Sequence, residues 1–262
     1  MIKKNTRQLE FDRDLVLADA RKEIARRLEQ PARRSFLRRS LTLGGLSLLS
    51  GCAITDENSV ETALMQVSRF NDKVQGWLFD STRLAPTYPD SMITRPFPFN
   101  AYYGEDEIRE IEEEGYRLEV TGLVADKRTW TLAELRAMPQ TDQVTRHICV
   151  EGWSAIGKWG GVPFADFLRR VGADLSARYV GFKCADDYYT SIDMPTALHP
   201  QTLLTLTYDS QPLPPRYGFP MKLRMPTKLG YKNPKHIQAI FVTNTYPGGY
   251  WEDQGYNWFG GS

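Results

Sequence analysis

One cysteine of the sequence stands among residues that could give it reactivity. Cys149 lies in the run RHICVEGWS, residues 146–154, with Arg146 and His147 before it and Glu151 after it. Cationic neighbours favour the thiolate, which is the form of cysteine that attacks electrophiles or binds soft metals. Polar residues interleaved so densely with valine and tryptophan are not typical of an ordinary core strand. The alternative is a buried structural cysteine at the end of a strand, and these residues alone leave both readings open.

The same run carries a family resemblance. RHICVEGWS, followed by WGGVPF at 159–164, resembles the molybdenum-cysteine motif of the sulfite oxidase family. The likeness is closest to the haem-free bacterial branch, that of the periplasmic protein-methionine-sulfoxide reductase catalytic subunit. It implies that Cys149 is catalytic and that its thiolate is a ligand of molybdenum carried by a molybdopterin. Arg146, His147 and Glu151 are then candidates for tuning the centre. The implied reaction is two-electron, oxygen-atom-transfer chemistry on a sulfoxide or another small oxo compound, free or protein-bound.

A second segment resembles a pterin contact of this family. The run FPFNAYYG at 97–104 is similar to the family's Asn-x-x-Tyr segment, which implies cofactor contacts at Asn100, Tyr103 and Gly104. An asparagine can donate and accept hydrogen bonds toward a pterin ring. Taken without the family, asparagine and glycine here simply make a turn. Gly104 departs from the reductase pattern, which has a glutamate, so a contact there could come only from the backbone.

A third segment, residues 213–237, is rich in lysine, arginine and proline. We expect two cationic strands joined by a glycine turn, which can bind a phosphate through lysine and backbone N–H groups. The segment resembles the family's pterin-phosphate site, and the implied cofactor contacts are Tyr217, Lys222, Asn233, Pro234 and Lys235. The reductase pattern has Asn and Arg at the first two positions, and lysine loses the bidentate geometry of arginine. The alternative is a basic, solvated hairpin.

Two further residues keep several interpretations. Cys184 stands where the reductase branch has a threonine near the metal pocket, and the resemblance makes it a cofactor-site candidate. It could equally be a disulfide partner of Cys149 or part of the core. His199 could line a substrate channel, cap a helix or satisfy a buried backbone carbonyl. The aromatic, glycine-rich tail at 246–259 is too apolar for a disordered end, so we expect it to pack near the core or the pocket mouth.

The elements that must position these residues are short. Alternating patterns predict strands at 116–124, 143–150, 179–184 and 188–192, and the second of these delivers Cys149 at its end. Helices are expected at 59–79, at 131–138 behind a Thr131–Glu134 capping box, and at 162–171, with a helix or turn at 201–204. We therefore predict an α+β domain over 97–262, with the sulfite oxidase catalytic fold of mixed sheets and short helices around a buried molybdopterin.

The first residues have the features of an export signal. A basic run with Arg33-Arg34 precedes a short apolar stretch that ends at Cys52. This order matches a twin-arginine signal, which exports proteins already folded, and its end resembles a lipobox. We therefore predict a signal peptide at 1–52 that uses the twin-arginine machinery and a periplasmic location, with a lipid on Cys52 as an anchor unless that cysteine is incidental. Residues 53–96 are predicted to be a polar, proline-rich linker and N-terminal arm.

Composition excludes several classes of protein. The formal net charge of +1 gives no argument for nucleic acid as a partner. The three cysteines and three histidines form no CxxC, CxxCH or HExxH pattern, and no phosphate-binding glycine loop is present. The family resemblance implies a membrane haem protein as electron-transfer partner. Two alternatives stay open: a cysteine-nucleophile enzyme that pairs Cys149 with His147 or His199, and a lipid-anchored binding domain without cofactor.

Overall fold

The computed structural model describes residues 57–262. The predicted export signal and Cys52 lie outside these residues. The chain divides into two units, residues 1–63 and 64–262, and the second carries the sheets and the cavity described below. Helix α3 (Glu57–Leu78) agrees with the helix predicted at 59–79. Among the described residues, no helix has the length and apolar character needed to cross a bilayer.

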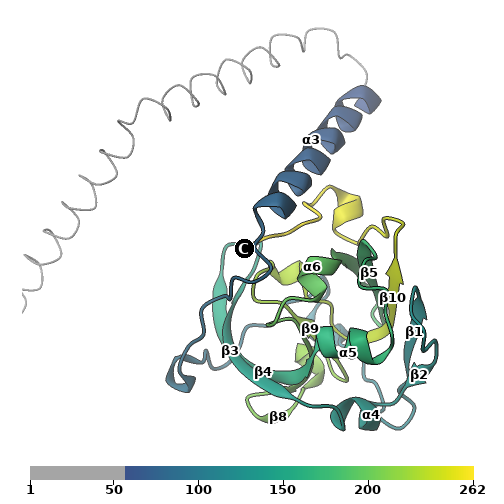
Figure 1. Ribbon diagram of the computed structural model, residues 1–262. Helices are drawn as coiled ribbons and strands as arrows, with labels where there is room; N and C mark the ends of the chain where they lie inside the picture. The colour runs from purple at the N-terminus through teal and green to yellow at the C-terminus, as the bar shows by residue number, and fades with distance from the viewer. Residues whose placement is uncertain (1–56) are drawn as a thin grey trace, which may run out of the picture. The chain divides into compact units, whose positions relative to one another are not determined.

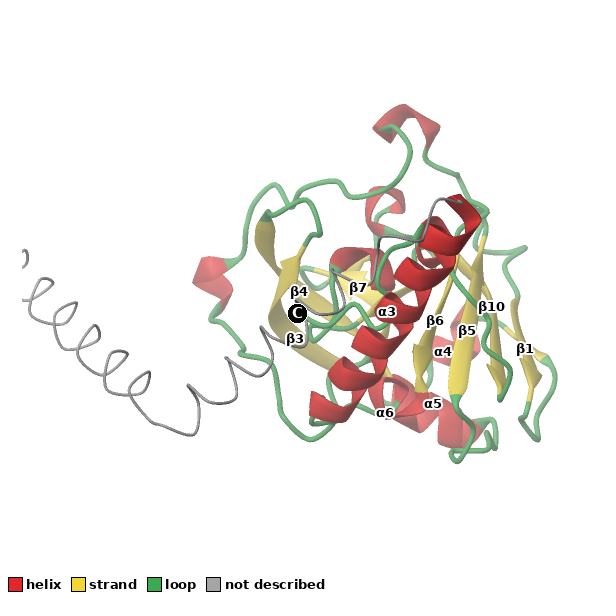
Figure 2. Ribbon diagram, turned by 90° about the horizontal axis from the view of Figure 1, so that it is seen from above, coloured by secondary structure: helices red, strands yellow, loops and turns green. Residues whose placement is uncertain are grey.

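Two five-stranded sheets make up the second unit, and they lie on different sides of it in both views (Figures 1 and 2). The first has the order β2 (Thr129–Trp130), β1 (Leu118–Gly122), β10 (Ile237–Thr243), β5 (Tyr179–Cys184), β6 (Tyr189–Asp193). The second runs β3 (Thr141–Ile148), β4 (Ser154–Pro163), β7 (Leu203–Tyr208), β8 (Gln211–Pro212), with β9 (Lys222–Arg224) paired to β7. Among these strands of residues 57–262, β1 and β10 pair in parallel and the other pairs are antiparallel.

Apart from α3, the helices of this unit are short. They are α4 (Leu132–Arg136), α5 (Phe164–Arg170) and α6 (Met194–Ala197), with 3-10 turns η2 (Asp90–Met92), η3 (Glu105–Glu107), η4 (Pro215–Tyr217), η5 (Gly230–Lys232) and η6 (Glu252–Gln254). The predicted capping box starts α4, because the Thr131 hydroxyl accepts from the Glu134 N–H and the Glu134 carboxylate accepts from the Thr131 N–H. The predicted α+β class is confirmed.

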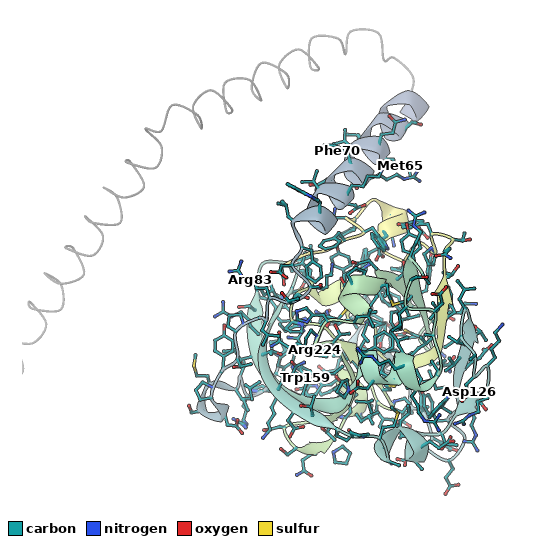
Figure 3. The ribbon with its side chains drawn as sticks, viewed as in Figure 1. Met65, Phe70, Arg83, Asp126, Trp159 and Arg224 are labelled. Atoms are coloured by element: carbon teal, nitrogen blue, oxygen red, sulfur yellow. The ribbon has the colours of Figure 1, made fainter. Side chains whose placement is uncertain are left out.

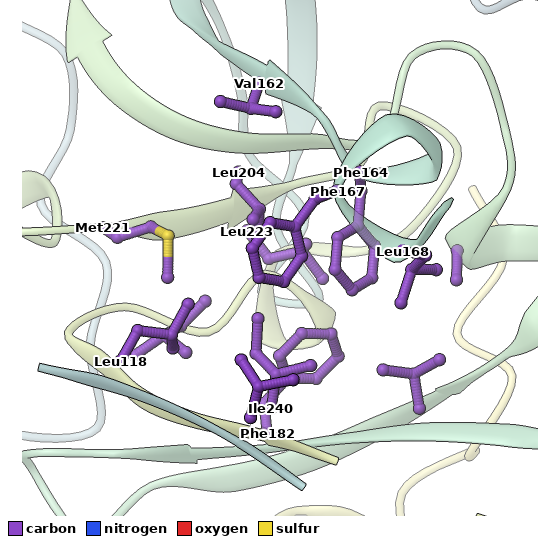
Figure 4. Close-up of a cluster of buried hydrophobic side chains, with 14 of the residues drawn as sticks. Leu118, Val162, Phe164, Phe167, Leu168, Phe182, Leu204, Met221, Leu223 and Ile240 are labelled. Carbon is purple, nitrogen blue, oxygen red and sulfur yellow. The ribbon is translucent and has the colours of Figure 1, made fainter. Parts of the chain in front are cut away.

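The two sheets share one hydrophobic core (Figure 4). The first sheet contributes Leu118, Phe182 and Ile240, and the second contributes Val162, Leu204 and Leu223. Helix α5 adds Phe164, Phe167 and Leu168, all 0% exposed, as its apolar face predicts. Because both sheets bury one face in the same core, their strand ends are fixed relative to each other.

Two expectations about local structure were wrong. The helix or turn expected at 201–204 gives way to strand β7 from Leu203, and the helix lies earlier, at α6. Residues 213–237 do not form a hairpin: β9 pairs with β7 in one sheet, whereas β10 pairs with β1 and β5 in the other. The basic segment therefore crosses between the sheets. Its charge pattern could not predict this, because the partners of both strands lie far away in sequence.

Candidate active site

Cys149 directly follows the last residue of strand β3. That residue, Ile148, pairs with Ser154 of β4, and a tight turn connects the two strands. The Cys149 N–H donates to the Trp153 carbonyl at 2.9 Å, and the Gly152 N–H donates to the Cys149 carbonyl at 3.1 Å. Gly152 has a φ of +92°, which favours glycine and allows the turn to close. Because side chains alternate along a strand, His147 and Cys149 share one face of β3.

That face opens into a cavity of about 140 Å³ between the two sheets' strand ends. The sequence-predicted residues that it brings together are Asn100, Cys149, Lys222, Asn233, Pro234 and Lys235. The tuning candidates His147 and Glu151 also line it. Residues from three distant segments of the sequence thus meet around one thiol.

The cysteine is held as a thiol by its surroundings. Cys149 is 6% exposed, and burial is the main influence that raises the pKa of its thiol. Its Sγ lies 3.5 Å from a carboxylate oxygen of Glu151, and the Asn100 amide nitrogen lies 3.7 Å away. The Glu151 carboxylate also raises this pKa, whereas backbone N–H groups of Val150 and Glu151 lower it, and the thiolate expected from the sequence stays a prediction for the metal-bound state. A metal ion at the sulfur would remove the proton.

His147 is packed tightly against a loop from across the cavity. Its Nε2 lies 3.1 Å from the Asn100 amide nitrogen, and its Nδ1 is buried without a partner among the described residues. Burial, assisted by Arg224, holds the pKa of His147 well below its usual range, so the ring is neutral. A Cβ on Gly230 would lie 2.7 Å from His147 Nε2 and 2.8 Å from the Asn100 amide nitrogen. Glycine is therefore required there for the two loops to approach.

Three buried cations converge beside the histidine. Lys222, Arg224 and Lys235 are 3%, 0% and 9% exposed. The Lys222 ammonium lies 4.7 Å from the ring centre of Trp159, and in the described part of the chain it has no hydrogen bond or ion pair. Lys235 donates to the Arg216 carbonyl at 3.0 Å, and burial lowers its pKa to about 8. Figure 3 shows Arg224 and Trp159 inside the fold.

Arg224 ties this cluster to strand β3. It donates to the Arg146 carbonyl at 2.6 Å and to the Thr145 hydroxyl at 3.2 Å, while its Nε is buried without a partner in the described residues. Burial lowers its pKa to about 9. The amide of Asn233 accepts from the Met225 N–H at 2.6 Å and so fixes the neighbouring loop. The signal for Arg224 was its alternation with Lys222 in the sequence KLR, and our prediction missed it.

The donor set fits an anionic cofactor that carries its own metal. Buried cations without matching buried acids are unfavourable unless a bound anion compensates them. Unpartnered polar atoms on His147 and Arg224 and the close approach at Gly230 indicate a cradle for a polar, planar group. Among residues 57–262, no cluster of three or more His, Cys, Asp or Glu side chains could hold a metal ion. A metal at Cys149 would therefore bring most of its ligands with it, as a molybdopterin does.

Four predicted cofactor residues lie outside the lining of this cavity. The Tyr103 hydroxyl donates to the Asp186 carboxylate at 3.1 Å, and Gly104 begins η3 on the surface. Tyr217 is packed among aromatic rings and donates to the Phe97 carbonyl at 2.9 Å. Cys184 is a free thiol in the main core, so it forms no disulfide with Cys149. Their roles toward a cofactor stay predictions. From these positions they would act indirectly, by holding lining residues in place.

His199 also lies away from the cavity. Its Nε2 is 3.0 Å from the Arg83 carbonyl, and its Nδ1 accepts from the Gln201 N–H at 3.1 Å. Of the roles that the sequence allowed for His199, hydrogen bonding to a buried backbone carbonyl, that of Arg83, agrees with this position.

The cavity also contains residues that the sequence did not single out. Lining side chains beyond the predicted set are Tyr102, Asp186, Tyr188, Tyr231, Trp251 and Tyr256. The last two confirm that the aromatic tail packs at the pocket. The others come from strand ends and loops whose convergence depends on the pairing of β5, β6 and β10. Nothing in the local pattern around Asp186 could have indicated its position.

A family model matches the chain. Residues 105–251, more than half of the sequence, match the oxidoreductase molybdopterin binding domain. A chain from Azospira oryzae, named provisionally as the protein-methionine-sulfoxide reductase subunit YedZ1, is 74% identical over 262 residues, which are 100% of both chains. An oxidoreductase of Bacillus subtilis, YuiH, is 27% identical over 64% of this chain and 85% of its own length.

More distant relatives match over part of their length. The protein-methionine-sulfoxide reductase catalytic subunit MsrP of Ralstonia nicotianae is 33% identical over 161 residues, 55% of this chain and 49% of that protein. The match thus spans about half the length of that relative. Among solved structures, the sulfane dehydrogenase SoxCD of Paracoccus pantotrophus is similar with a TM-score of 0.50 and 18% identity, over 53% of this chain and 40% of that chain. This last likeness concerns the fold alone, and with the family model it confirms the predicted fold type.

Proposed function

The chain belongs to the oxidoreductase molybdopterin binding domain family, and on that premise we propose that it reduces sulfoxides at a molybdenum ligated by Cys149. The single observation that carries this proposal is the cavity lined by both the buried Cys149 thiol and the Lys222 ammonium, which has no ion pair among the described residues. A thiol beside uncompensated cations is the donor set that an anionic, metal-carrying cofactor requires.

Bound molybdenum-molybdopterin supplies the two-electron chemistry and the exchange of an oxygen atom. The residues of the chain bind and orient it. Cys149 gives the protein thiolate, and its proton leaves on metal binding. Lys222, Lys235 and the Asn233-Pro234 turn would hold the anionic end of the cofactor, and Asn100 and neutral His147 would contact its ring. Glu151, 3.5 Å from Sγ, and Asp186 are carboxyl groups of the lining that can hold or pass protons.

The substrate class follows from the chemistry of the lining. A sulfoxide joins a polar S=O group to apolar substituents, and its reduction is R₂SO + 2 H⁺ + 2 e⁻ → R₂S + H₂O. Tyr102, Trp251 and Tyr256 offer aromatic surface to the apolar substituents, and sulfur packs well against aromatic rings. The names of the Azospira and Ralstonia relatives point to methionine sulfoxide within proteins, and we propose that class for this chain.

The cellular setting is a further part of the proposal. We propose export to the periplasm through the twin-arginine route, which would carry the protein folded with its cofactor, and a lipid on Cys52 as the membrane anchor. Electrons would then come from a membrane haem protein. The sequence features at 33–52 support this setting.

The test is metal analysis combined with turnover. The protein, expressed with its own signal, should contain about one molybdenum per chain and oxidise reduced methyl viologen when methionine sulfoxide is added. Cys149→Ala should lose at least about a hundredfold in that rate, because the metal loses its protein ligand. Lys127→Ala, at an exposed position outside the cavity, is the control and should leave the rate within about twofold. A folded protein without molybdenum would refute the proposal.

A cysteine-nucleophile mechanism is not favoured. Such a mechanism needs an imidazole within hydrogen-bond reach of the thiol. The recorded contacts of Cys149 Sγ are with Glu151 and Asn100, and His199 is engaged with the Arg83 carbonyl. The raised pKa of Cys149 also opposes a free thiolate.

A further inference from the structure

Helix α3 carries an apolar stripe along one side. At about 100° of rotation per residue, six of its seven large apolar residues at positions 64–78 fall within an arc of about 140°. No charged residue of positions 64–78 falls within this arc, and its one polar residue is Asn71. The six apolar residues, which we call the α3 stripe, are Leu64, Val67, Phe70, Val74, Trp77 and Leu78.

The opposite side of α3 contacts the C-terminal tail. The Asp72 carboxylate accepts from the Asn257 side-chain amide at 2.7 Å and from the Phe259 N–H at 2.9 Å. Gly76 faces the Phe259 ring, since a Cβ at this position would lie 3.7 Å from it. Asp72 and Gly76 fall about 150° and about 170° from the centre of the α3 stripe. The helix thus turns its polar side toward the tail and its apolar side away, which is the reverse of an ordinary surface helix.

The α3 stripe is open to solvent. Phe70 is 66% exposed and Trp77 is 82% exposed. The other exposed members, at 64%, 65% and 67%, are Leu64, Val67 and Leu78. Figure 3 shows Phe70 on α3. A contiguous exposed apolar surface marks a site of contact with a protein or a membrane, and no part of residues 57–262 covers this one.

The chain just before α3 contains the predicted site of lipid attachment. Cys52 lies outside the described residues and precedes Glu57, the first residue of α3, by five positions. Five residues reach at most about 18 Å when fully extended. Because a diacylglycerol on the Cys52 sulfur would insert into a bilayer, the first turn of α3 would lie within that distance of the membrane surface. The apolar phase nearest to the α3 stripe is then the bilayer itself.

The width and composition of the α3 stripe match a helix that lies on a membrane. Such helices bury a broad face containing Trp, Phe and Leu, and tryptophan favours the headgroup boundary. A coiled-coil seam is narrower, because it uses only two positions in seven. In the seam that α3 could form, the a positions are Leu64, Asn71 and Leu78, and the d positions are valines. Two-stranded pairing favours the reverse order, so a second copy of the chain suits the stripe less well than lipid.

The charged residues of α3 lie beside the stripe. Arg69 and Lys73 fall on one flank. Glu57 and Glu61 fall on the other, and Asp72 faces the tail. Three acids and two bases give no net attraction to anionic lipid headgroups. Membrane contact therefore depends on the burial of apolar surface, and salt should not disrupt it.

We propose that the α3 stripe lies in the interfacial region of the bilayer, with α3 parallel to the membrane, and that this contact orients the enzyme there. The proposal rests on the proposed cellular setting and goes beyond it, because a lipid on Cys52 alone leaves the domain free to rotate about its linker. The tail packs on the opposite side of α3 and lines the cavity with Trp251 and Tyr256, so the tail stays on the aqueous side.

The test measures contact between Trp77 and lipid acyl chains. The full chain, expressed with its own signal, is reconstituted into vesicles of phosphatidylethanolamine and phosphatidylglycerol with brominated acyl chains, which quench tryptophan fluorescence on contact. Trp77→Phe gives the signal of the other tryptophans. Phe70→Ser removes an aromatic group of the stripe. Met65→Ser is the matched control, because Met65 is 49% exposed on the same helix but lies outside the stripe.

We expect brominated lipid to remove about half or more of the Trp77 emission, at low and at high salt. Phe70→Ser should reduce this quenching about threefold or more, because an aromatic side chain supplies a large share of the buried apolar area. Met65→Ser should be quenched as the wild type is. Equal urea midpoints of the two serine variants show that both are folded.

Three results would overturn the proposal: no quenching of Trp77 in the wild type, equal quenching in Phe70→Ser and the wild type, or quenching that high salt abolishes. A concentration-dependent dimer that Phe70→Ser disperses, without quenching, would assign the stripe to a second copy of the chain instead. Mass spectrometry of Cys52 separates this inference from the proposed setting. Quenching without a lipid on Cys52 would support the α3 contact and refute the anchor, whereas a lipid without quenching would do the opposite.

Discussion

Two buried lysines of the same basic segment, Lys222 and Lys232, differ in the groups that surround their ammonium groups. Lys232 is 0% exposed and forms an ion pair with the buried Glu252 of the tail, and it donates to the Ser191 carbonyl at 2.7 Å. Lys222 is equally deep, yet in the described chain it has only the ring of Trp159 near its ammonium. Burial lowers the pKa of both lysines, but only for Lys232 does a carboxylate oppose that effect.

The difference separates a structural contact from a binding contact. The Lys232–Glu252 pair fixes the tail, whose Trp251 and Tyr256 line the cavity, so it is satisfied without any ligand. The Lys222 ammonium has no ionic partner among the described residues, and a bound anion would supply one. A buried charge without a partner lowers stability in the free protein and gains its value on binding. Replacing Lys232 should therefore lower the free energy of unfolding, whereas replacing Lys222 should raise it.

The largest effect is expected at the satisfied pair. Lys232→Met leaves Glu252 buried without its cation, and we expect a loss of about 3–5 kcal/mol in the free energy of unfolding, measured by urea denaturation of the cofactor-free protein. The double variant Lys232→Met/Glu252→Leu should recover most of it, because no lone charge remains. A loss below about 1 kcal/mol for the single variant would contradict the assigned role of the pair.

The unsatisfied cation should behave differently. Lys222→Met keeps the packing on Trp159 and removes a buried charge, so we expect the cofactor-free protein to gain about 1–2 kcal/mol in its free energy of unfolding. The same variant, isolated from cells that make molybdopterin, should contain less molybdenum. Lys127→Met, at an exposed position, is the control for loss of a positive charge. A destabilisation as large as that of Lys232→Met would show that Lys222 is structural.

The smallest effect concerns pH. Lys235 has a pKa of about 8 in the folded protein against an ordinary value of 10.5, because burial disfavours its charge. Between these values the unfolded chain binds more protons, so the free energy of unfolding rises with pH. The cost of Lys235 is fully present below pH 8 and is relieved as pH rises toward 10.5. Relative to Lys235→Met, the cofactor-free wild type should gain on the order of 1 kcal/mol for each pH unit within this range. Parallel pH profiles of the two proteins would contradict this.

Local patterns predicted much of the scaffold. The alternation at 116–124 gave β1, and the Thr131–Glu134 spacing gave the cap of α4, because both signals depend on neighbours within a few residues. Strand β7 was missed because its run LLTLTY, buried on both faces, has little of the alternation that marks a half-exposed strand. The predicted basic hairpin was wrong for a related reason: the charge pattern of a segment does not indicate which distant strand that segment pairs with.

The site divides in the same way. Cys149, its cationic and acidic neighbours and the turn at Gly152 are contiguous, and the sequence alone predicted that a cysteine ends a strand within a cofactor-type motif. The tertiary structure decided the rest. Pairing of β10 with both β1 and β5 brings Asp186 and Lys235 to the cavity, and the crossing of residues 213–237 between the sheets leaves Lys222 without an acid. Protonation and charge balance depend on burial and on partners remote in sequence, and these exist only once the sheets have packed.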